Sequence, residues 1–168
     1  GKSMFAHDAP AAAQVMAATA VAGLPRWAKL SPNTDRLVQV ATACAEAGAD
    51  AVTLTNTLLG LVIDIETRRP VLGGGGGGVS GPGMGPIAVR AVWDVARALP
   101  QLPIIGAGGV CDADSAIQLL MAGASAVQVG TATFADPRAP QRVLDDLTRW
   151  CHDHGVTSVA ELCGASHR

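Results

Sequence analysis

The stretch of residues 103–134, PIIGAGGVCDADSAIQLLMAGASAVQVGTATF, decides the predicted fold of this chain. It reads as a short apolar strand that ends in glycines, a helix, and a second apolar strand that ends in Gly-Thr. Neither strand alternates apolar with polar residues, which is typical of parallel strands buried on both faces. Asp112 or Asp114 can cap the helix, and Gly123 is placed to end it. The stretch therefore predicts a β-α-β unit.

The glycines of this unit come directly after its two strands, as Gly108-Gly109 and Gly130-Thr131. Parallel strands that are neighbours place these ends side by side at the carboxyl edge of a sheet. Glycine lets backbone N–H groups approach an anion closely, and β/α barrels often bind phosphate between their last two loops. Either pair alone could simply form a tight turn. The two pairs together favour a phosphate site.

Composition indicates one domain that spans residues 1–168. Apolar residues make up 49% of the chain and charged residues 15%, so most of it is expected in a core. The net charge of −2 gives no electrostatic basis for binding nucleic acid or an anionic membrane. No apolar run approaches the ~20 residues of a membrane-spanning helix, and the first residues do not resemble a signal peptide. We expect a soluble, cytoplasmic protein.

The four cysteines predict neither a metal site nor a disulfide framework, because they are widely spaced and form no CxxC pair. Cys44 falls on the apolar stripe of a predicted helix and is expected to be buried. The run of residues 151–154, Cys-His-Asp-His, resembles a metal cluster. Its position at the end of a predicted helix favours a solvated last turn instead.

The rest of the chain alternates helices with short apolar strands. Helices are predicted over residues 9–22 and from Asp35 to Gly48. A third helix is predicted before residue 103, with these residues facing inward: Ile87, Val89, Val92, Trp93 and Ala96. A last helix is predicted over 136–154, with these residues on one face: Val143, Leu144, Leu147 and Trp150. Strands are predicted over 26–30 and 51–56, with an inserted hairpin over 61–72. The six glycines of residues 73–78 predict a mobile loop over the mouth of a barrel, or a flexible linker.

Four strands and five helices in alternation require a parallel sheet with helices outside it. A (β/α)8 barrel typically takes ~250 residues, so this chain is predicted to be about half of one. Three polar residues fall at strand ends, where such barrels bind ligands. Lys29 is either a solvated charge at the sheet edge or a cation that faces the ligand. Asn56 and Thr57 either hydrogen-bond the backbone of their own turn or bind a small polar substrate.

Five ordered motifs resemble class 1 dihydroorotate dehydrogenases, most closely the NAD-linked 1B subfamily. They are WAKLSPN at 27–33, NTLLG at 56–60, VSGP at 79–82, IIGAGG at 104–109 and ASAVQVGT at 124–131. The resemblance extends over essentially the whole chain. It implies an α/β fold of the TIM barrel family, with this chain covering roughly the second half, strands five to eight.

The resemblance also implies an FMN cofactor and the oxidation of dihydroorotate to orotate in pyrimidine biosynthesis. Lys29 would approach the flavin ring, where a cation stabilises the negative charge of reduced FMN. The other implied cofactor residues are Thr55 and Gly81 at the ring, and Gly108, Gly109, Gly130 and Thr131 at the phosphate. The implied substrate residues are Asn56 and Thr57.

No catalytic residue is assigned to this chain. The family's catalytic base, a cysteine in 1B enzymes, lies on a loop of the N-terminal half, so we expect it outside this sequence and expect the isolated chain to be inactive. The implied partners are a second copy of the chain in a homodimer and a subunit with FAD and an iron–sulfur cluster that passes electrons to NAD. The all-glycine run departs from the mixed sequence usual in the family, and it could loosen that loop.

Two alternatives remain open. The pyrimidine-reducing domain of dihydropyrimidine dehydrogenase shares the Lys-Leu-x-Pro-Asn and Asn-Thr motifs, and would act on uracil instead of dihydroorotate. A non-catalytic half-barrel with residual phosphate-ligand binding would self-associate through its unpaired strand edges. A different FMN-phosphate barrel family fits the motifs least well.

Overall fold

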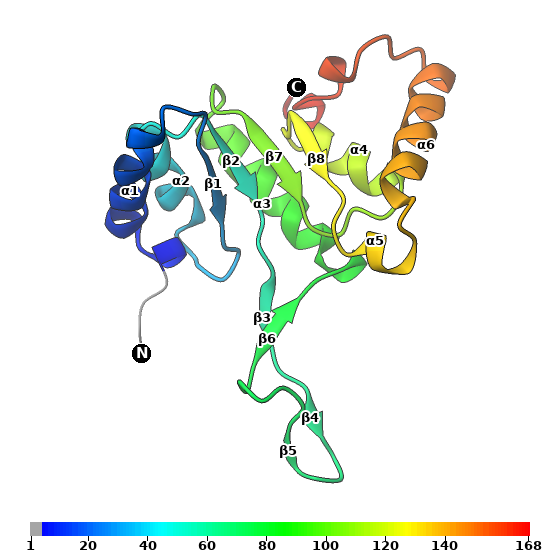
Figure 1. Ribbon diagram of the computed structural model, residues 1–168. Helices are drawn as coiled ribbons and strands as arrows, with labels where there is room; N and C mark the ends of the chain where they lie inside the picture. Colours follow the sequence, from blue (N-terminus) through cyan, green and yellow to red (C-terminus); the bar gives the residue numbers. More distant parts are fainter. Residues whose placement is uncertain (1–4) are drawn as a thin grey trace.

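The computed structural model describes residues 5–168 and is built around one four-stranded parallel sheet (Figure 1). The order of its strands is β1-β2-β7-β8. Their bounds are β1 Trp27–Leu30, β2 Ala51–Leu54, β7 Ile104–Ala107 and β8 Ala126–Gln128. All three pairings are parallel, as the alternation of strands and helices predicted.

Helices connect these strands, and Figure 1 shows α2, α3 and α4 behind the sheet. The α-helices are α1 Ala9–Ala18, α2 Leu37–Glu46, α3 Gly85–Ala98, α4 Ala113–Met121, α5 Ala132–Ala135 and α6 Ala139–Asp153. Short 3₁₀ turns are η1 Phe5–His7, η2 Thr19–Ala22, η3 Pro82–Met84, η4 Val159–Glu161 and η5 Ala165–His167.

The two faces of the sheet differ in burial. Ala28 and Leu30 of β1 are buried, and their neighbours in the core are Val40 and Cys44 of α2 and Val92 of α3. The alternate positions of β1 point to the opposite face, where Trp27 is 59% exposed and Lys29 is also exposed. The opposite face is therefore open to solvent at the β1 edge.

The β7-α4-β8 unit forms in the predicted order, but of its two strands only β7 is buried: β8 is an edge strand of the sheet, and its Ala126 and Gln128 are exposed. Asp112 caps α4: its carboxylate accepts the backbone N–H of Ser115 at 2.9 Å, and the Ser115 hydroxyl in turn accepts the backbone N–H of Asp112 at 3.2 Å. Gly123, with φ +120°, follows the helix in a conformation that side chains disfavour. The apolar stripe of α4 is buried, with Met121 partly so.

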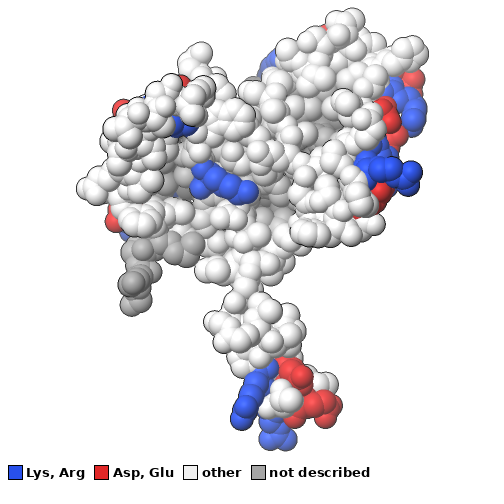
Figure 2. All heavy atoms as spheres, in the orientation of Figure 1, with Lys and Arg blue, Asp and Glu red and all other residues white. Residues whose placement is uncertain are grey.

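Two small antiparallel pairs form an arm that extends away from the sheet (Figure 1). Strand β3, Leu58–Gly60, pairs with β6, Gly77–Val79, at the root of the arm, and β4, Ile63–Asp64, pairs with β5, Arg69–Pro70, near its tip. The hairpin is thus confirmed. Figure 2 shows the acidic and basic side chains of the arm gathered at its tip.

Several predicted boundaries are wrong. Gly77 and Gly78 form part of a strand and not of a loop, because their backbone pairs with β3, and the arm extends away from the sheet. Helix α2 begins at Leu37 and not at Asp35, and α6 begins at Ala139 after the separate short helix α5. Ile87, which was expected to face inward, is 38% exposed, and Leu144, which was expected on the apolar face of its helix, is 55% exposed.

Candidate active site

A cavity of about 500 Å³ lies at the carboxyl edge of the sheet. Its volume falls within the range of about 300–1,000 Å³ that is usual for small-molecule sites. The sequence-predicted site residues all line it: Lys29, Thr55, Asn56, Thr57, Gly81, Gly108, Gly109, Gly130 and Thr131. They come from strand β1, from the loops after β2, β7 and β8, and from the segment before α3. The structure therefore brings the nine together, while their individual roles stay predictions.

The glycine pair after β7 holds a conformation that other residues disfavour, with φ +124° at Gly108 and +81° at Gly109. A Cβ on Gly109 would lie 2.5 Å from the backbone nitrogen of Gly85, the first residue of α3. A Cβ on Gly108 would lie 3.0 Å from that of Ala88. These glycines let the β7 loop pack directly against α3, which fixes the cavity wall.

The loop after β8 has space instead. A Cβ on Gly130 would meet no atom within 4 Å, and Thr131 beside it is exposed. On the other side of the cavity, Gly81 is buried with φ +94°, and a Cβ there would lie 3.8 Å from Cγ2 of Thr131. The residues before α3 and the β8 loop thus face each other across a narrow gap.

Thr55 carries an unpaired hydroxyl at the cavity. The side chain is 4% exposed, and its Oγ1 has no hydrogen-bond partner among the described residues. Its backbone N–H donates to the carbonyl of Ala107 at 2.6 Å, which ties the ends of β2 and β7 together. A buried hydroxyl without a partner costs free energy, so a ligand in the cavity that bonds Oγ1 would relieve that cost.

Asn33 positions the backbone around Thr57, one of the two predicted substrate residues, a role that the sequence-based assignment of site residues missed. Its Nδ2 donates to the carbonyl of Thr57 and to the hydroxyl of buried Ser31, both at 2.9 Å. Its Oδ1 accepts the backbone N–H of Leu59 at 2.8 Å. The Asn56 carboxamide oxygen accepts the N–H of Thr57, which leaves the amide nitrogen of Asn56 facing solvent. The SPN triplet after β1 was the available signal.

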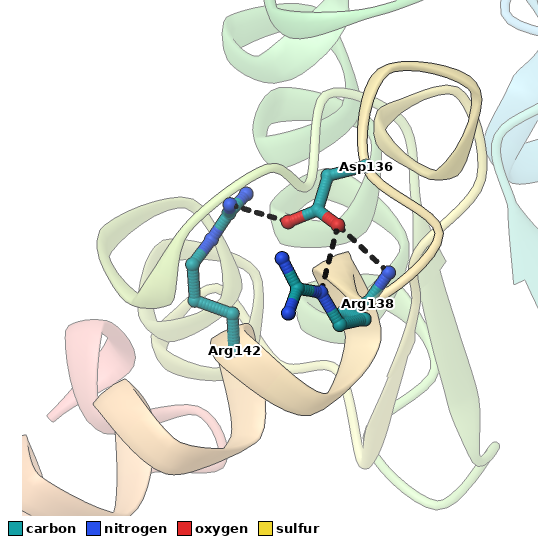
Figure 3. A network of polar contacts seen from close by, with 3 residues as sticks. All are labelled: Asp136, Arg138 and Arg142. Carbon is teal, nitrogen blue, oxygen red and sulfur yellow. Dashed lines mark hydrogen bonds and ion pairs between the residues drawn. The ribbon is translucent and has the colours of Figure 1, made fainter.

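Three further residues line the cavity near the glycine loops and were not predicted: Cys111, Asp136 and Arg142. Figure 3 shows Asp136 between two arginines. Its Oδ2 accepts from Nη1 of Arg142 at 2.8 Å, and its Oδ1 accepts from the backbone N–H of Arg138 at 2.9 Å, with Nε of Arg138 at 3.6 Å. The Arg138 N–H and both guanidinium charges lower the pKa of the Asp136 carboxyl.

Burial, followed by the adjacent Asp112 carboxylate, raises the pKa of the Cys111 thiol, while the Arg142 charge opposes this shift. Burial also raises the pKa of Cys44, which lies in the core as predicted. The Cys-His-Asp-His run at 151–154 ends α6 with its last three residues exposed. Among residues 5–168, no group of three His, Cys, Asp or Glu side chains is placed to hold a metal ion. The same residues include no helix long and apolar enough to cross a membrane.

The cavity carries a cationic side chain toward each end of the sheet. Glycine loops and the Arg142 guanidinium lie at the β7–β8 end, and the Lys29 side chain comes from β1 at the other end of the sheet. Backbone N–H groups of the glycine loops and the Arg142 guanidinium can together neutralise an anionic group of a ligand at the β7–β8 end.

Comparison with known proteins gives the family. The family model for dihydroorotate dehydrogenase matches residues 1–150. A dihydroorotate dehydrogenase B (NAD(+)) catalytic subunit from Pelobacter propionicus is 49% identical over 166 residues, which are 98% of this chain and 54% of that protein. The corresponding subunit from Citrifermentans bemidjiense is 51% identical over 141 residues, 84% of this chain and 46% of that protein.

A solved structure of the dihydroorotate dehydrogenase from Eimeria tenella, in complex with ferulenol, superposes with a TM-score of 0.70 at 29% identity. The superposition covers 84% of this chain and 38% of that one. The chain spans about half the length of the curated relatives it matches. On the family model, the identities and the shared fold, this chain belongs to the dihydroorotate dehydrogenase family.

Proposed function

We propose that this chain supplies the flavin and pyrimidine contacts of an FMN-dependent enzyme that oxidises dihydroorotate to orotate. The observation that carries the proposal is the single cavity at the carboxyl edge of the sheet, because all nine residues implied by the family resemblance line it. Bound FMN would supply the chemistry by accepting a hydride from the substrate.

The residues present fit FMN. The phosphate would be held by backbone N–H groups of Gly108, Gly109, Gly130 and Thr131, and the open space beside Gly130, where a Cβ would meet no atom within 4 Å, leaves room for it. The unpaired Oγ1 of Thr55 suits a flavin ring edge, which offers both donors and acceptors, at the centre of the cavity.

The remaining three predicted side chains complete the ring and pyrimidine contacts. Lys29 from β1 would place a cation beside the ring and stabilise the negative charge of the reduced flavin. Asn56 and Thr57 would orient the pyrimidine, and Asn33 supports the backbone at Thr57 and Leu59 through two hydrogen bonds. The backbone N–H of Asn56 already donates to the carbonyl of Leu30 at 2.8 Å, so its side chain projects from a fixed peptide.

We further propose that the chain forms strands five to eight of a (β/α)8 barrel. The relatives are about twice as long, and the sheet face opposite the helices is open at the β1 edge, where Trp27 and Lys29 are exposed. A second set of strands would cover that face and close the barrel. The group that takes the C5 proton of dihydroorotate would come from that other half, so this chain alone would bind flavin without turnover.

The partners follow from the same assignment. The curated relatives are named as NAD(+)-linked catalytic subunits, and we propose a comparable arrangement here, with an FAD and iron–sulfur subunit that passes electrons to NAD in the cytoplasm. We also propose a homodimer. Its support is the arm, where Leu61, Val62 and Ile65 are 57–82% exposed. Exposed apolar patches of this kind typically mark protein contacts.

Titration of the purified chain with FMN, followed by dihydroorotate, tests the proposed function. We expect saturable quenching of flavin fluorescence and no bleaching of the flavin after dihydroorotate is added. Bleaching would show that the chain holds its own base and would overturn the half-site proposal. Absence of any flavin binding would leave the chain as a non-catalytic half-barrel. Bleaching by reduced pyrimidines such as dihydrouracil, but not by dihydroorotate, would favour the dihydropyrimidine dehydrogenase alternative.

A further inference from the structure

Arg142 lies at the end of the cavity where the glycine loops meet. Among the described residues that line the cavity, it and Lys29 are the two with cationic side chains. Lys29 comes from β1 at one edge of the sheet, whereas Arg142 comes from α6, which follows the opposite edge strand β8. The two cations therefore serve different ends of whatever ligand occupies the cavity.

The position of Arg142 along its helix is unfavourable without a partner. It is the fourth residue of α6, in the first turn, where the partial positive charge of the helix N-terminus disfavours cations. Asp136 compensates for this, because its carboxylate accepts from Arg142 at 2.8 Å while Arg138 binds its other oxygen. Figure 3 shows that Asp136 holds both arginines, so the trio keeps one positive charge in excess.

Most N–H donors of the Arg142 guanidinium have no hydrogen-bond partner among the described residues. Arginine carries five N–H donors in a planar fork, and within residues 5–168 its side chain makes a single hydrogen bond, to Asp136. The side chain is 52% exposed, and it lies close enough to Cys111, two residues beyond Gly109, for its charge to act on that thiol. Several donors thus remain for a ligand beside the β7 loop.

We propose that Arg142 is an anion-binding residue of this cavity and that Asp136 positions it for the ligand's phosphate. This inference rests on the proposed function, because it assumes that the phosphate of FMN lies at the glycine loops. Glycine N–H groups bind phosphate through partial charges, whereas Arg142 adds a full charge and a bidentate donor. The consequence is selectivity: Arg142 favours FMN over riboflavin, which has no phosphate.

Arg142→Gln tests the proposal, with Arg138→Gln as its matched control. Both arginines bind Asp136, but Arg138 does not line the cavity and is 90% exposed. We expect Arg142→Gln to weaken FMN binding about tenfold, which corresponds to loss of one charge-assisted hydrogen bond, and to change riboflavin binding by less than about twofold. Arg138→Gln should leave both affinities unchanged within about twofold. Arg142→Lys should recover part of the loss.

Fluorescence titrations of the full chain with FMN and with riboflavin separate the outcomes. If the parent chain prefers FMN and Arg142→Gln keeps that preference, glycine N–H groups alone bind the phosphate and this inference is refuted, while the proposed function stands. If Arg142→Gln weakens FMN and riboflavin equally, the residue acts through the fold and not on the phosphate, which also refutes it.

If the parent chain binds neither flavin, the proposed function fails on its own. Arg142 is then tested with inorganic phosphate, by the broadening of its phosphorus NMR signal on addition of protein. Broadening by the parent chain that Arg142→Gln reduces supports an anion-binding Arg142. Equal broadening by the two proteins, or none by either, refutes it. Circular dichroism and urea unfolding of each variant exclude misfolding as the cause of any loss.

Discussion

Replacement of Gly109 by alanine should damage the cavity wall and the stability of the chain together. Gly109 has φ +81°, a conformation that residues with a Cβ rarely adopt. An added Cβ would lie 2.5 Å from the nitrogen and 2.6 Å from Cα of Gly85, and 3.3 Å from the carbonyl oxygen of Pro82. These are backbone atoms at the start of α3, so no side chain rotation can make room for the methyl group.

The cost of Gly109→Ala has two separable parts. The left-handed conformation costs an alanine about 1–2 kcal/mol. Overpacking against fixed backbone costs about 1–3 kcal/mol, which gives a total of about 2–5 kcal/mol in the free energy of unfolding. Gly23→Ala is the matched control: Gly23 has φ +61°, but its Cβ would meet no atom within 4 Å. The control should therefore lose only the conformational part.

Urea unfolding followed by the fluorescence of the three tryptophans measures both variants. We expect Gly109→Ala to lose about 1–3 kcal/mol more than Gly23→Ala. Its flavin affinity should fall as well, since the β7 loop must move to relieve the contact. If the two variants unfold at the same urea concentration with the same slope, the loop does not pack on α3 as described and the reasoning is refuted.

Three further predictions concern single side chains. Thr55→Val removes an unpaired buried hydroxyl, so we expect unfolding stability to hold or to rise by up to about 1 kcal/mol while FMN affinity falls; reduced stability in a urea titration would show that Oγ1 has a partner. Asn33→Ala should cost about 1–3 kcal/mol, because it removes the side-chain hydrogen bonds to the Ser31 hydroxyl, the Thr57 carbonyl and the Leu59 N–H, and it should weaken orotate binding more than FMN binding in parallel titrations. Asp112→Ala should cost about 1 kcal/mol at neutral pH through loss of the α4 cap. The Ser115 hydroxyl and N–H lower the Asp112 pKa in the folded state, so this stabilisation is full above about pH 4 and is lost as the pH falls through the folded value; a cost of Asp112→Ala that stays constant down to pH 2 would contradict this.

The sheet could be predicted from the sequence because the residues that define each strand and helix lie within that element or next to it. The strands of the β7-α4-β8 unit are unbroken apolar runs, and the Asp112 cap and the final Gly123 lie within a few residues of the helix they bound. Position at strand ends singled out Lys29, Asn56-Thr57 and the two glycine-bearing pairs, because parallel strands place their carboxyl ends at one edge. Thr55 and Gly81 were named only through the family resemblance.

The errors come from interactions between residues far apart in the chain. Strand β6 escaped prediction because glycine has low strand propensity, and Gly77 pairs there only because Gly60 lies opposite. The same holds for Asn33, whose carboxamide bonds Thr57 and Leu59 across 24 and 26 residues. Arg142 was missed because a cation near the start of a helix gives no sequence signal of the loops that it faces.

The arm has a mechanical consequence for the cavity. Strand β3 begins directly after Thr57, and β6 ends at Val79, and both of these residues line the cavity. At the root of the arm, the Thr57 side chain occupies the space that a Cβ on Gly78 would need, so ribbon and cavity wall touch. The arm and the cavity therefore share backbone at Thr57 and Val79, so any displacement of the arm at its root would also displace these two residues of the cavity wall.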